Sequence, residues 1–552
     1  MKQSKQTAPQ VYRGIGIGAG GVDGVLRFFR RRGMTERKIG AYRGKDGEML
    51  RLRHALEEVG GRLNVLVQRT VREIGQKEAQ IFEIHAMLLE DADFLETLEE
   101  EIGAGSCAEQ AVTHASEKYA AILMELSDPY LRARAADLRD VARQIIAALS
   151  EEEEPMHAEE GTPYILVADD LAPSETVTLD KNRLLGFVTF TGTPNSHTSI
   201  LARAMGIPAL VGVGEIDDAQ DGAYALLSAA DGMLTVSPTD AQKQAFQARM
   251  KETNALAQEH ERYLRSLIHK PAITRGGHRM LIYANVGGRD EAESARLNGA
   301  DGIGLLRSEF LYLAEKDYPS EEALYRSYCE IVSQLQGKRI VIRTLDIGAD
   351  KQISYFSLPK EENPALGFRG VRICLAREEL FKTQLRAILR ASAHGSISVM
   401  IPMIVSVEEV RACRQLLEEC KEELRKRKQG FDEGLEFGIM IETPAAAIMC
   451  EELAEEVDFF SVGTNDLLQY TLAADRQNPA VSRLCEENTE PVLRMIRAAS
   501  EAIHRHGGWI GICGELAADL HLTQRFADMR IDELSVSVPY LLGVRERVIE
   551  CK

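Results

Sequence analysis

Residues 436–444 have the sequence Glu-Phe-Gly-Ile-Met-Ile-Glu-Thr-Pro, in which a short apolar run ends at a charged residue, Glu442. Short apolar runs bounded by turn signals predict buried strands. Beyond Arg279 the chain contains eight such runs, with segments of helical periodicity between them: 280–285, 302–306, 339–344, 397–403, 436–441, 457–462, 509–512 and 533–537. Eight β/α units in a region of this size predict a C-terminal TIM (β/α)8 barrel.

The chemistry of a TIM barrel lies where its strands end. Five of the eight predicted strands bring a charged, polar or nucleophilic side chain to that rim: Arg307, Arg343, Glu442, Asn465 with Asp466, and Cys513. The carboxylates of Glu442 and Asp466 suit Mg²⁺, which takes one or two protein carboxylates and fills its shell with water and substrate oxygens. The alternative for each of them is a carboxylate in a surface loop.

The remaining rim residues favour an anionic ligand. Arg307, Arg343 and Arg476 carry planar charged forks that suit phosphate and carboxylate, although a structural salt bridge explains each arginine taken alone. Asn465 is placed to donate to a phosphate oxygen. Cys513 is either a small buried residue or a proton donor at the rim, and its glycine neighbours leave room for a ligand. The predicted ligand is small and phosphorylated, and it carries a carboxylate.

The first half of the chain has a different organisation. Residues 1–33 and 155–239 contain short strand-like runs and predict an α/β domain, in which the glycine-rich stretch 11–30 forms an edge strand and turn. Residues 34–154 have helical periodicity almost throughout and predict an all-helical domain inserted into it. Residues 240–269 predict a polar linker helix, and residues 270–552 the barrel. The fold class is therefore multidomain α/β.

His197 is the most informative residue of this first half. It follows a loop at residues 191–195 and precedes an apolar-periodic segment from Ile200 to Met205 that predicts a helix. The free N–H groups of a helix N-terminus bind phosphate oxygens, and a neutral imidazole is a good nucleophile near neutral pH. A lone loop histidine is usually not catalytic, so the functional interpretation rests on its combination with the rim residues.

Composition sets limits on partners and location. The chain has 552 residues and a net charge of −19, which argues against nucleic-acid binding. It lacks both an apolar stretch long enough to span a membrane and a signal-peptide core, so no membrane association is expected. Nine cysteines without CxxC spacing indicate reduced thiols in the cytoplasm and make structural zinc improbable.

Six strings of the sequence are jointly specific: Ser-His-Thr-Ser-Ile-Leu-Ala-Arg (196–203), Gly-Leu-Leu-Arg-Ser-Glu-Phe (304–310), Arg-Thr-Leu-Asp-Ile-Gly-Ala-Asp-Lys (343–351), Ile-Glu-Thr-Pro-Ala-Ala-Ala (441–447), Gly-Thr-Asn-Asp-Leu (463–467) and Cys-Gly-Glu-Leu (513–516). Together they strongly resemble Enzyme I of the phosphotransferase system, a family of phosphoenolpyruvate–protein phosphotransferases. The resemblance covers nearly the whole chain, including residues 83–91 and 134–140 of the helical segment.

The resemblance implies a role for each matched residue. It implies that His197 is phosphorylated at Nε2, that Glu442 and Asp466 hold Mg²⁺, and that Cys513 protonates the enolate. It implies that phosphoenolpyruvate (PEP) is bound by Arg307, Arg343, Asn465, Asp466 and Arg476, with Arg369 lining the rim and Thr176 near His197. It further implies that the helical insert docks the carrier protein HPr and that the barrel forms a homodimer.

We therefore expect a Mg²⁺-dependent enzyme that passes phosphate from PEP to His197 and then to HPr, with a swivel about residues 155–162 and 237–270. Met87, Leu88 and Leu89 beside Glu90 and Asp91 form an expected carrier-docking spot with an acidic border, unless these apolar residues belong to the helix core. The sequence departs from the family before His197, where Gly192 is followed by Thr193-Pro194-Asn195 without the usual basic residue, and at Gly18–Gly21.

Three alternative functions remain open. The departures before His197 and at Gly18–Gly21 permit a paralogous regulatory phosphotransferase that serves a different carrier. A dikinase-like enzyme that interconverts pyruvate and PEP shares the histidine and barrel motifs, but it needs a nucleotide-binding domain for which we find no segment and no P-loop. A non-catalytic PEP sensor would need neither a nucleophile nor an acid, so His197 together with Cys513 argues against it.

Overall fold

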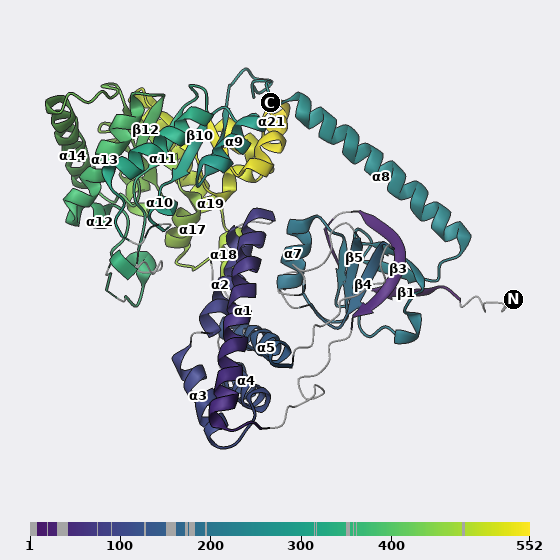
Figure 1. Ribbon diagram of the computed structural model, residues 1–552. Coiled ribbons are helices and arrows are strands. Elements are labelled where there is room, and N and C mark those ends of the chain that lie inside the picture. Colours follow the sequence, from purple (N-terminus) through teal and green to yellow (C-terminus); the bar gives the residue numbers. More distant parts are fainter. Residues whose placement is uncertain are drawn as a thin grey trace. The chain divides into compact units, whose positions relative to one another are not determined.

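A computed structural model of the protein (Figure 1) describes residues 8–18, 20–29, 42–73, 76–89, 91–125, 129–150, 162–171, 175, 183–193, 196–313, 315, 317–348, 354–356, 358–359, 361–476, 478 and 481–552. The chain divides into two compact units, Met1–Gln258 and Glu259–Lys552. Each unit has its own buried apolar clusters.

The α/β part of the first unit is built on an eight-stranded mixed sheet in the order β1-β8-β7-β3-β4-β5-β6-β2. Strands β3 to β6 are parallel, and the others pair antiparallel around them. Both faces of the central strand β4 are buried, as alternation of side chains requires for a covered sheet. The strands are β1 Gln10–Arg13, β2 Ile15–Ile17, β3 Gly21–Phe29, β4 Tyr164–Ala168, β5 Leu184–Thr189, β6 Ala209–Val211, β7 Tyr224–Ser228 and β8 Met233–Val236.

The prediction of a single edge strand and turn over residues 11–30 is wrong. Three strands occupy this stretch; β1 and β2 lie at the two edges of the sheet, but β3 lies inside it between β7 and β4. The glycines explain the difference, because Gly21 and Gly24 pair with Ser228 and Ala225 of β7 where an added Cβ would collide with neighbouring atoms. The stretch was taken for a turn because glycine is also the commonest turn residue.

The expected helix after the 191–195 loop is present as α7, His197–Met205. Ser196 caps it, accepting a hydrogen bond from the Ser199 N–H, and Gly206 ends it in the left-handed conformation with φ 67°. The Thr198 hydroxyl, in the first turn, donates a 2.9 Å hydrogen bond to the carbonyl of Leu171, which follows β4. His197 is therefore the first residue of a well-capped helix.

The helical insert between β3 and β4 is confirmed. Its helices are α1 Lys45–Glu73, α2 Gln76–Leu89, α3 Ala92–Gly103, α4 Ala108–Glu125 and α5 Pro129–Ser150. Helix α1 packs on α2 and α5, and α4 packs on α3 and α5 (Figure 1). One polar contact is buried with the apolar core: His85 of α2 faces Asp137 and Asp140 of α5 at 3.6 and 3.7 Å.

A long helix, α8, runs from Asp240 to Ser266 and contains the division between the two units (Figure 1). Phe246 is its buried residue, and most of its other side chains are exposed. A helix of this length with so little apolar burial is stabilised mainly along its own axis, by pairs such as Glu261 with Arg265 at 2.7 Å.

The C-terminal barrel is confirmed. Eight parallel strands close in the order β9 to β16, and β16 pairs with β9. They are β9 Leu281–Val286, β10 Ile303–Arg307, β11 Ile340–Arg343, β12 Ile397–Ile401, β13 Glu436–Ile441, β14 Phe459–Val462, β15 Trp509–Ile512 and β16 Glu533–Val536. Each lies within two residues of its predicted bounds. Apolar side chains of the strands and surrounding helices form one continuous cluster around the barrel.

Helices connect the strands on the outside (Figure 1). They are α9 Arg289–Leu297, α10 Glu309–Leu313, α11 Glu321–Gln334, α12 Val371–Ala376, α13 Glu378–Ser392, α14 Val407–Lys426, α15 Pro444–Ile448, α16 Cys450–Ala454, α17 Thr464–Leu472, α18 Ser482–Glu487, α19 Glu490–Arg505, α20 Thr523–Asp528 and α21 Leu541–Glu550. The short helices α10, α15 and α17 begin one to three residues after a strand ends, so their first turns lie next to the rim.

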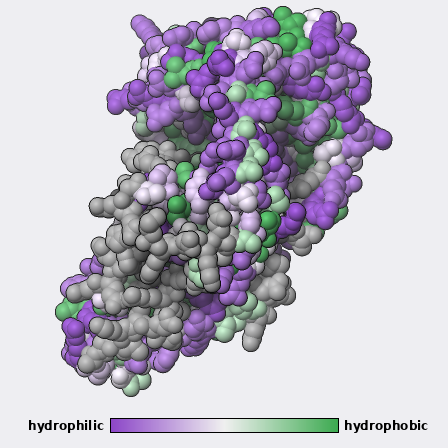
Figure 2. All heavy atoms as spheres, turned by 90° about the vertical axis from the view of Figure 1, so that its right-hand side faces the viewer, coloured by the Kyte–Doolittle hydropathy of each residue, from purple (hydrophilic) through white to green (hydrophobic). Residues whose placement is uncertain are grey.

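The face shown in Figure 2 is predominantly hydrophilic, with hydrophobic residues in small separate groups, as a chain with a net charge of −19 predicts. Among the described residues, none of the helices is long and apolar enough to cross a membrane.

The start and the end of the barrel are joined by one buried guanidinium. Arg545 of α21 is 1% exposed and donates to the carbonyls of Lys270 and Gly299, both at 2.6 Å, and to the Asp301 carboxylate at 3.1 Å. We expect Arg545→Met to lower the stability of the barrel unit by about 3 kcal/mol, because both carbonyls and the carboxylate lose their buried donor. Scanning calorimetry of the full chain measures this loss.

The matched control is Arg494→Met, which removes an arginine that is 80% exposed and paired with Glu490. Such a surface pair contributes less than about 1 kcal/mol, so the control should unfold almost as the wild type does. Equal effects of the two substitutions would show that Arg545 does not hold the barrel ends together.

Candidate functional site at the carboxyl ends of the barrel strands

The predicted rim residues lie at one end of the barrel. Arg307 and Arg343 are the last residues of β10 and β11, and Glu442 and Cys513 directly follow β13 and β15. Asn465 and Asp466 lie in the first turn of α17, after β14. All six therefore lie at the carboxyl ends of parallel strands, where enzymes with this fold hold their ligands.

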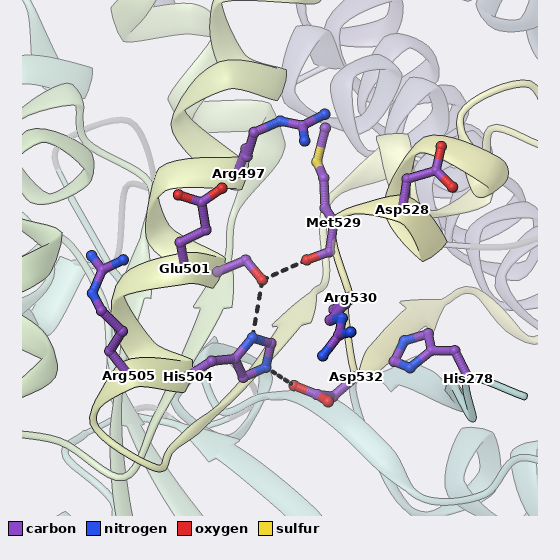
Figure 3. A pocket seen from close by; sticks show the side chains of 10 residues that line it. His278, Arg497, Glu501, His504, Arg505, Asp528, Met529, Arg530 and Asp532 are labelled. Atoms are coloured by element: carbon purple, nitrogen blue, oxygen red, sulfur yellow. Dashed lines mark hydrogen bonds and ion pairs between the residues drawn. The ribbon is translucent and has the colours of Figure 1, made fainter. Parts of the chain in front are cut away.

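The opposite end of the barrel has a pocket of about 690 Å³ (Figure 3). Its polar side chains make contacts that stabilise the fold. His504 binds Asp532 at 2.8 Å, and Ser500 donates to the Met529 carbonyl at 2.7 Å (Figure 3). The ring of His278 contacts the Ile531 carbonyl at 2.9 Å. These contacts anchor the turn that leads into β16. The pocket contains none of the predicted site residues.

At the carboxyl end, two arginines are held by buried carboxylates. Arg343 binds Glu309 at 2.9 Å and Asp346 at 3.1 Å, and Arg369 binds Asp346 at 2.9 Å and Asp466 at 3.4 Å. Burial favours the neutral guanidinium, but the adjacent carboxylates, Glu309 and Asp346 for Arg343 and Asp346 and Asp466 for Arg369, outweigh it and raise the pKa of both arginines. Both side chains are thus fixed, permanent cations.

Glu442 lies among other acids. It is 1% exposed, and its Oε1 accepts a 2.6 Å hydrogen bond from the Met403 N–H. Its other oxygen, Oε2, lies 2.9 Å from the point where a Cβ on Gly463 would be, so a larger residue at 463 would fill this space. Burial and the charges of Asp346 and Asp466 raise the pKa of Glu442 well above its ordinary value.

This arrangement fits a divalent cation with few protein ligands. Within the described residues no group of three or more His, Cys, Asp or Glu side chains forms a metal site, so an all-protein cage is not available there. Glu442 and Asp466 supply two carboxylates that repel each other. A cation between them would remove the repulsion that raises the Glu442 pKa. Mg²⁺ is typically bound by one or two protein carboxylates, and water and substrate oxygens fill its remaining coordination positions.

The other predicted ligand-binding residues also lie at this rim. Arg307 is exposed, and desolvation together with the positive charge of Arg343 lowers the pKa of its guanidinium. Arg476 is exposed and lies 4.0 Å from Asp466. Asn465 exchanges hydrogen bonds with Glu515, accepting one from its N–H at 2.8 Å and donating one to its carboxylate at 3.3 Å. The guanidinium groups of Arg307 and Arg476 and the amide of Asn465 are therefore donors that could bind an anionic ligand beside the carboxylates.

Cys513 is buried beside the rim, 4% exposed. Its Sγ lies 3.6 Å from the Val462 carbonyl, to which it is placed to donate. Burial raises the pKa of the thiol to about 11, although Ser461 and Arg343 lower it in part. The thiol is therefore protonated at neutral pH, the state that a proton donor requires.

Three rim residues were missed from the sequence. Glu309 bridges the Arg343 guanidinium and the Asp346 N–H, and Asp346 joins Arg343 to Arg369. The Tyr470 hydroxyl lies 3.3 Å from Arg369 and donates to the Ala365 carbonyl at 2.5 Å. Glu309 and Asp346 occur two or three residues after the predicted arginines in the same strings, so their position after a strand was the available signal.

The predicted residues of the first unit are less completely described. His197 begins α7, and Thr176 lies outside the described residues. Of the expected docking spot, Met87 is 69% exposed, whereas Leu88 and Leu89 pack on the helical core. Asp91 is exposed and caps α3 through the Phe94 N–H at 2.9 Å, and Glu90 lies outside the described residues.

Comparison with known families assigns all three parts of the chain. Residues 261–552 match the family model described as PEP-utilising enzyme, PEP-binding domain. Residues 10–134 match the N-terminal domain of PEP-utilising enzymes, and residues 161–232 match their mobile domain.

Individual relatives are similar over most of the chain. The phosphoenolpyruvate-protein phosphotransferase of Haemophilus influenzae is 41% identical over 502 residues, which cover 89% of this chain and 85% of the relative. The Bacillus subtilis protein of the same name is 36% identical over 505 residues, covering 91% and 88%. A solution structure named Enzyme I (nEIt) matches 44% of this chain and 99% of its own with 29% identity and a TM-score of 0.38.

The acidic rim makes a prediction about stability. A carboxyl whose native pKa is raised keeps its proton to higher pH than in the unfolded chain, where its pKa is about 4.3. The native state then binds more protons, so its stability falls as pH rises through the raised pKa. Without added metal, we expect Glu442→Gln to have a higher Tm than the wild type at alkaline pH and a smaller loss of Tm between neutral and alkaline pH.

Scanning calorimetry of the full chain in chelator at several pH values tests this. Glu455→Gln removes the same charge from an exposed position and should leave the pH dependence unchanged. Parallel pH curves for Glu442→Gln and the wild type would contradict the buried repulsion at the rim.

Proposed function

The chain belongs to the PEP-utilising enzymes and, among them, to the phosphoenolpyruvate–protein phosphotransferases, and from this premise we propose that it transfers the phosphoryl group of PEP to His197 and from there to a histidine of a carrier protein of the HPr type. The observation that carries the proposal is the set of Arg343, Arg369, Glu442 and Asp466 brought together at the barrel rim.

We place PEP at that rim. Its phosphate and carboxylate need several cationic groups that are already oriented, and Arg343 and Arg369 are fixed by their carboxylate partners before any ligand binds. Arg307, Arg476 and Asn465 at the mouth supply further donors. Orienting the arginines in advance lowers the entropy cost of binding and of reaching the transition state.

Glu442 and Asp466 would hold Mg²⁺. The bound ion would neutralise charge on the phosphoryl oxygens and on the departing enolate. The residues themselves contribute placement: Met403 fixes one oxygen of Glu442, and Gly463 leaves space beside the other. Arg369 holds Asp466 from the opposite side at 3.4 Å.

The phosphoryl group would be transferred in two steps. The Nε2 lone pair of His197 forms a bond to phosphorus as the bond between phosphorus and the enol oxygen breaks, and the enolate leaves with that electron pair. The N–H groups of the first turn of α7 stabilise the phosphoryl oxygens. A histidine of the carrier then takes the phosphoryl group, one N–P bond replacing another.

Cys513 would complete the first step. Its Sγ–H gives a proton to C3 of the enolate, which becomes pyruvate, and a thiolate remains until it is protonated again. The raised pKa keeps the thiol protonated at neutral pH before the step. Burial at 4% exposure also limits competing reactions of the thiol.

The carrier would dock on the helical insert, where Met87 is exposed next to α3. The identity of the carrier as HPr rests on the family resemblance, as does assembly as a homodimer through the barrel. All nine cysteines are free thiols, eight of them buried, which suits a reducing cytoplasm.

The nucleophile can be tested alone. We expect His197→Ala to abolish phosphorylation of the protein by PEP while PEP affinity stays within a few-fold of wild type, because the proposed PEP ligands all belong to the barrel unit. Phosphorylation is measured by mass spectrometry under non-acidic conditions, and affinity by calorimetry. His521→Ala, an exposed histidine of the barrel, should behave as wild type. Phosphate on another histidine of the His197 variant would refute the assignment.

The metal site makes a separate prediction. We expect Asp466→Asn to slow phosphorylation of His197 by about a hundredfold or more and to raise the Mg²⁺ concentration needed for half-maximal rate, since even outer-shell partners of metal ligands contribute ten- to hundredfold. Asp528→Asn changes an exposed aspartate at the opposite end of the barrel and should have no such effect. Full wild-type rate in excess chelator would exclude a metal role for Glu442 and Asp466.

A further inference from the structure

A polar group inside the barrel holds the residue that carries the reacting thiol. The Asn285 side chain, from β9, donates from Nδ2 to the Cys513 carbonyl at 3.0 Å and to the Ser535 carbonyl at 3.2 Å. Ser535 belongs to β16, which lies between β9 and β15 in the barrel. One amide therefore ties together the carboxyl ends of three adjacent strands, including the one that Cys513 follows.

The hydrogens of this group run in one direction. Both donors of the Asn285 amide face carbonyls, so its Oδ1 must accept, and it accepts from the Ser535 hydroxyl at 2.7 Å. A hydroxyl has one hydrogen, and that hydrogen is used here. Only lone pairs of Ser535 Oγ remain for a neighbour, and a neighbour that donates a hydrogen suits them.

The Glu533 carboxyl lies beside this hydroxyl. Its Oε1 and the Ser535 Oγ lie 1.9 and 2.6 Å from the point where a Cβ on Gly304 would be, so both oxygens lie in the space that the glycine leaves. The Glu533 side chain is 2% exposed, and its Oε2 has no hydrogen-bond partner among the described residues. A buried carboxyl without a cationic partner in contact is more stable neutral, and a neutral carboxyl donates.

We propose that Asn285 and Ser535 are positioning residues for Cys513, and that the neutral carboxyl of Glu533 keeps their hydrogen-bond chain in the orientation that fixes the thiol for protonating the enolate. This inference rests on the proposed function, because it assigns support to the proposed proton donor. Asn285, Ser535 and Glu533 do not touch the substrate; they act through the backbone of Cys513.

Ionisation of Glu533 would reverse the direction of the hydrogen bonds in this group. A carboxylate is a stronger acceptor than an amide oxygen, so the Ser535 hydrogen would turn to it and Asn285 would lose its donor. Burial raises the pKa of Glu533 to about 8. Arg339 lowers this pKa, Asp532 and Glu436 raise it, and the remaining titratable groups that face the carboxyl are Tyr283 and Cys513. The hydrogen-bond chain of Asn285, Ser535 and Glu533 is therefore intact at neutral pH and weakened above about pH 8.

The first test follows the proton that is added to carbon. PEP deuterated stereospecifically at C3 is converted in tritiated water in a single turnover of the full-length protein, and the pyruvate is reduced at once to preserve its methyl group. The wild type should give one methyl configuration. Ser535→Ala should lower the rate of pyruvate formation by about ten- to a hundredfold, the cost of misplacing a reacting group, and should give mixed configurations. Its PEP affinity should stay within a few-fold of wild type.

Ser398→Ala is the matched control, since Ser398 is 1% exposed inside the same barrel and donates to Glu436 at 2.8 Å, and no hydrogen bond of the described residues links it to Cys513. It should keep one configuration and the wild-type rate. Wild-type rate and one configuration from Ser535→Ala would overturn the positioning role. A wild type that is not phosphorylated by PEP would overturn the proposed function, and this inference with it.

The second test uses pH. At saturating Mg²⁺ and PEP, the wild-type rate of pyruvate formation should fall above about pH 8 as Glu533 ionises. In Glu533→Gln the amide still donates but does not titrate, so the ratio of the rate at pH 9 to that at pH 7 should exceed the wild-type ratio. Circular dichroism confirms that the variant is folded, and Ser535→Ala gives a second variant if it is not. An unchanged ratio in folded Glu533→Gln would show that Glu533 does not control the chain.

Discussion

The structure depends on balancing buried charge at one end of the barrel. The carboxylates of Glu309, Asp346 and Asp466 form ion pairs with Arg343 and Arg369 there, and the buried carboxyl of Glu442 is close enough to feel the charges of both kinds. Each ion loses hydration on burial, and only a partner at hydrogen-bond distance compensates for that loss. Glu309 and Asp466 follow β10 and β14, whereas Arg343, Asp346 and Arg369 belong to β11 and the connection after it, so the rim depends on the closed barrel. The excess of acid that remains raises the Glu442 pKa and favours a bound cation.

The interior of the barrel has an apolar side and a polar side, and Cys513 lies where they meet. Leu305, Val341, Met400, Met440 and Phe459 form an apolar cluster that also contains Cys513. On the side of β9 and β16, the interior instead holds Asn285, Ser535 and Glu533 in one polar group. The thiol thus has an apolar environment, which keeps it protonated, while its own backbone is fixed by polar contacts. Cys513 has both an apolar environment and a polar backbone anchor because it follows β15, which borders the apolar and the polar side of the interior.

The sequence was sufficient for the barrel because each strand is a short apolar run and each helix is periodic, and both patterns are local. It was also sufficient to place Arg307, Arg343 and Glu442, which lie at the ends of those runs. It was not sufficient for Glu309 and Asp346, because their importance lies in contacts with Arg343 and Arg369 that only the folded rim brings together. The central position of β3 was missed for a related reason: the glycines that suggested a turn are required by close strand neighbours.

Under the proposed function, the charge of the rim gives a physical reason for carrying the nucleophile on another domain. An imidazole attacks phosphorus only when it is neutral, and carboxylates nearby favour its protonated form. A histidine built into the rim beside Glu442 and Asp466 would therefore be held as an imidazolium whenever substrate and cation are absent. His197, the proposed nucleophile, instead begins α7, where the N–H groups of the first turn carry partial positive charge. The same N–H groups suit the oxygens of a phosphoryl group.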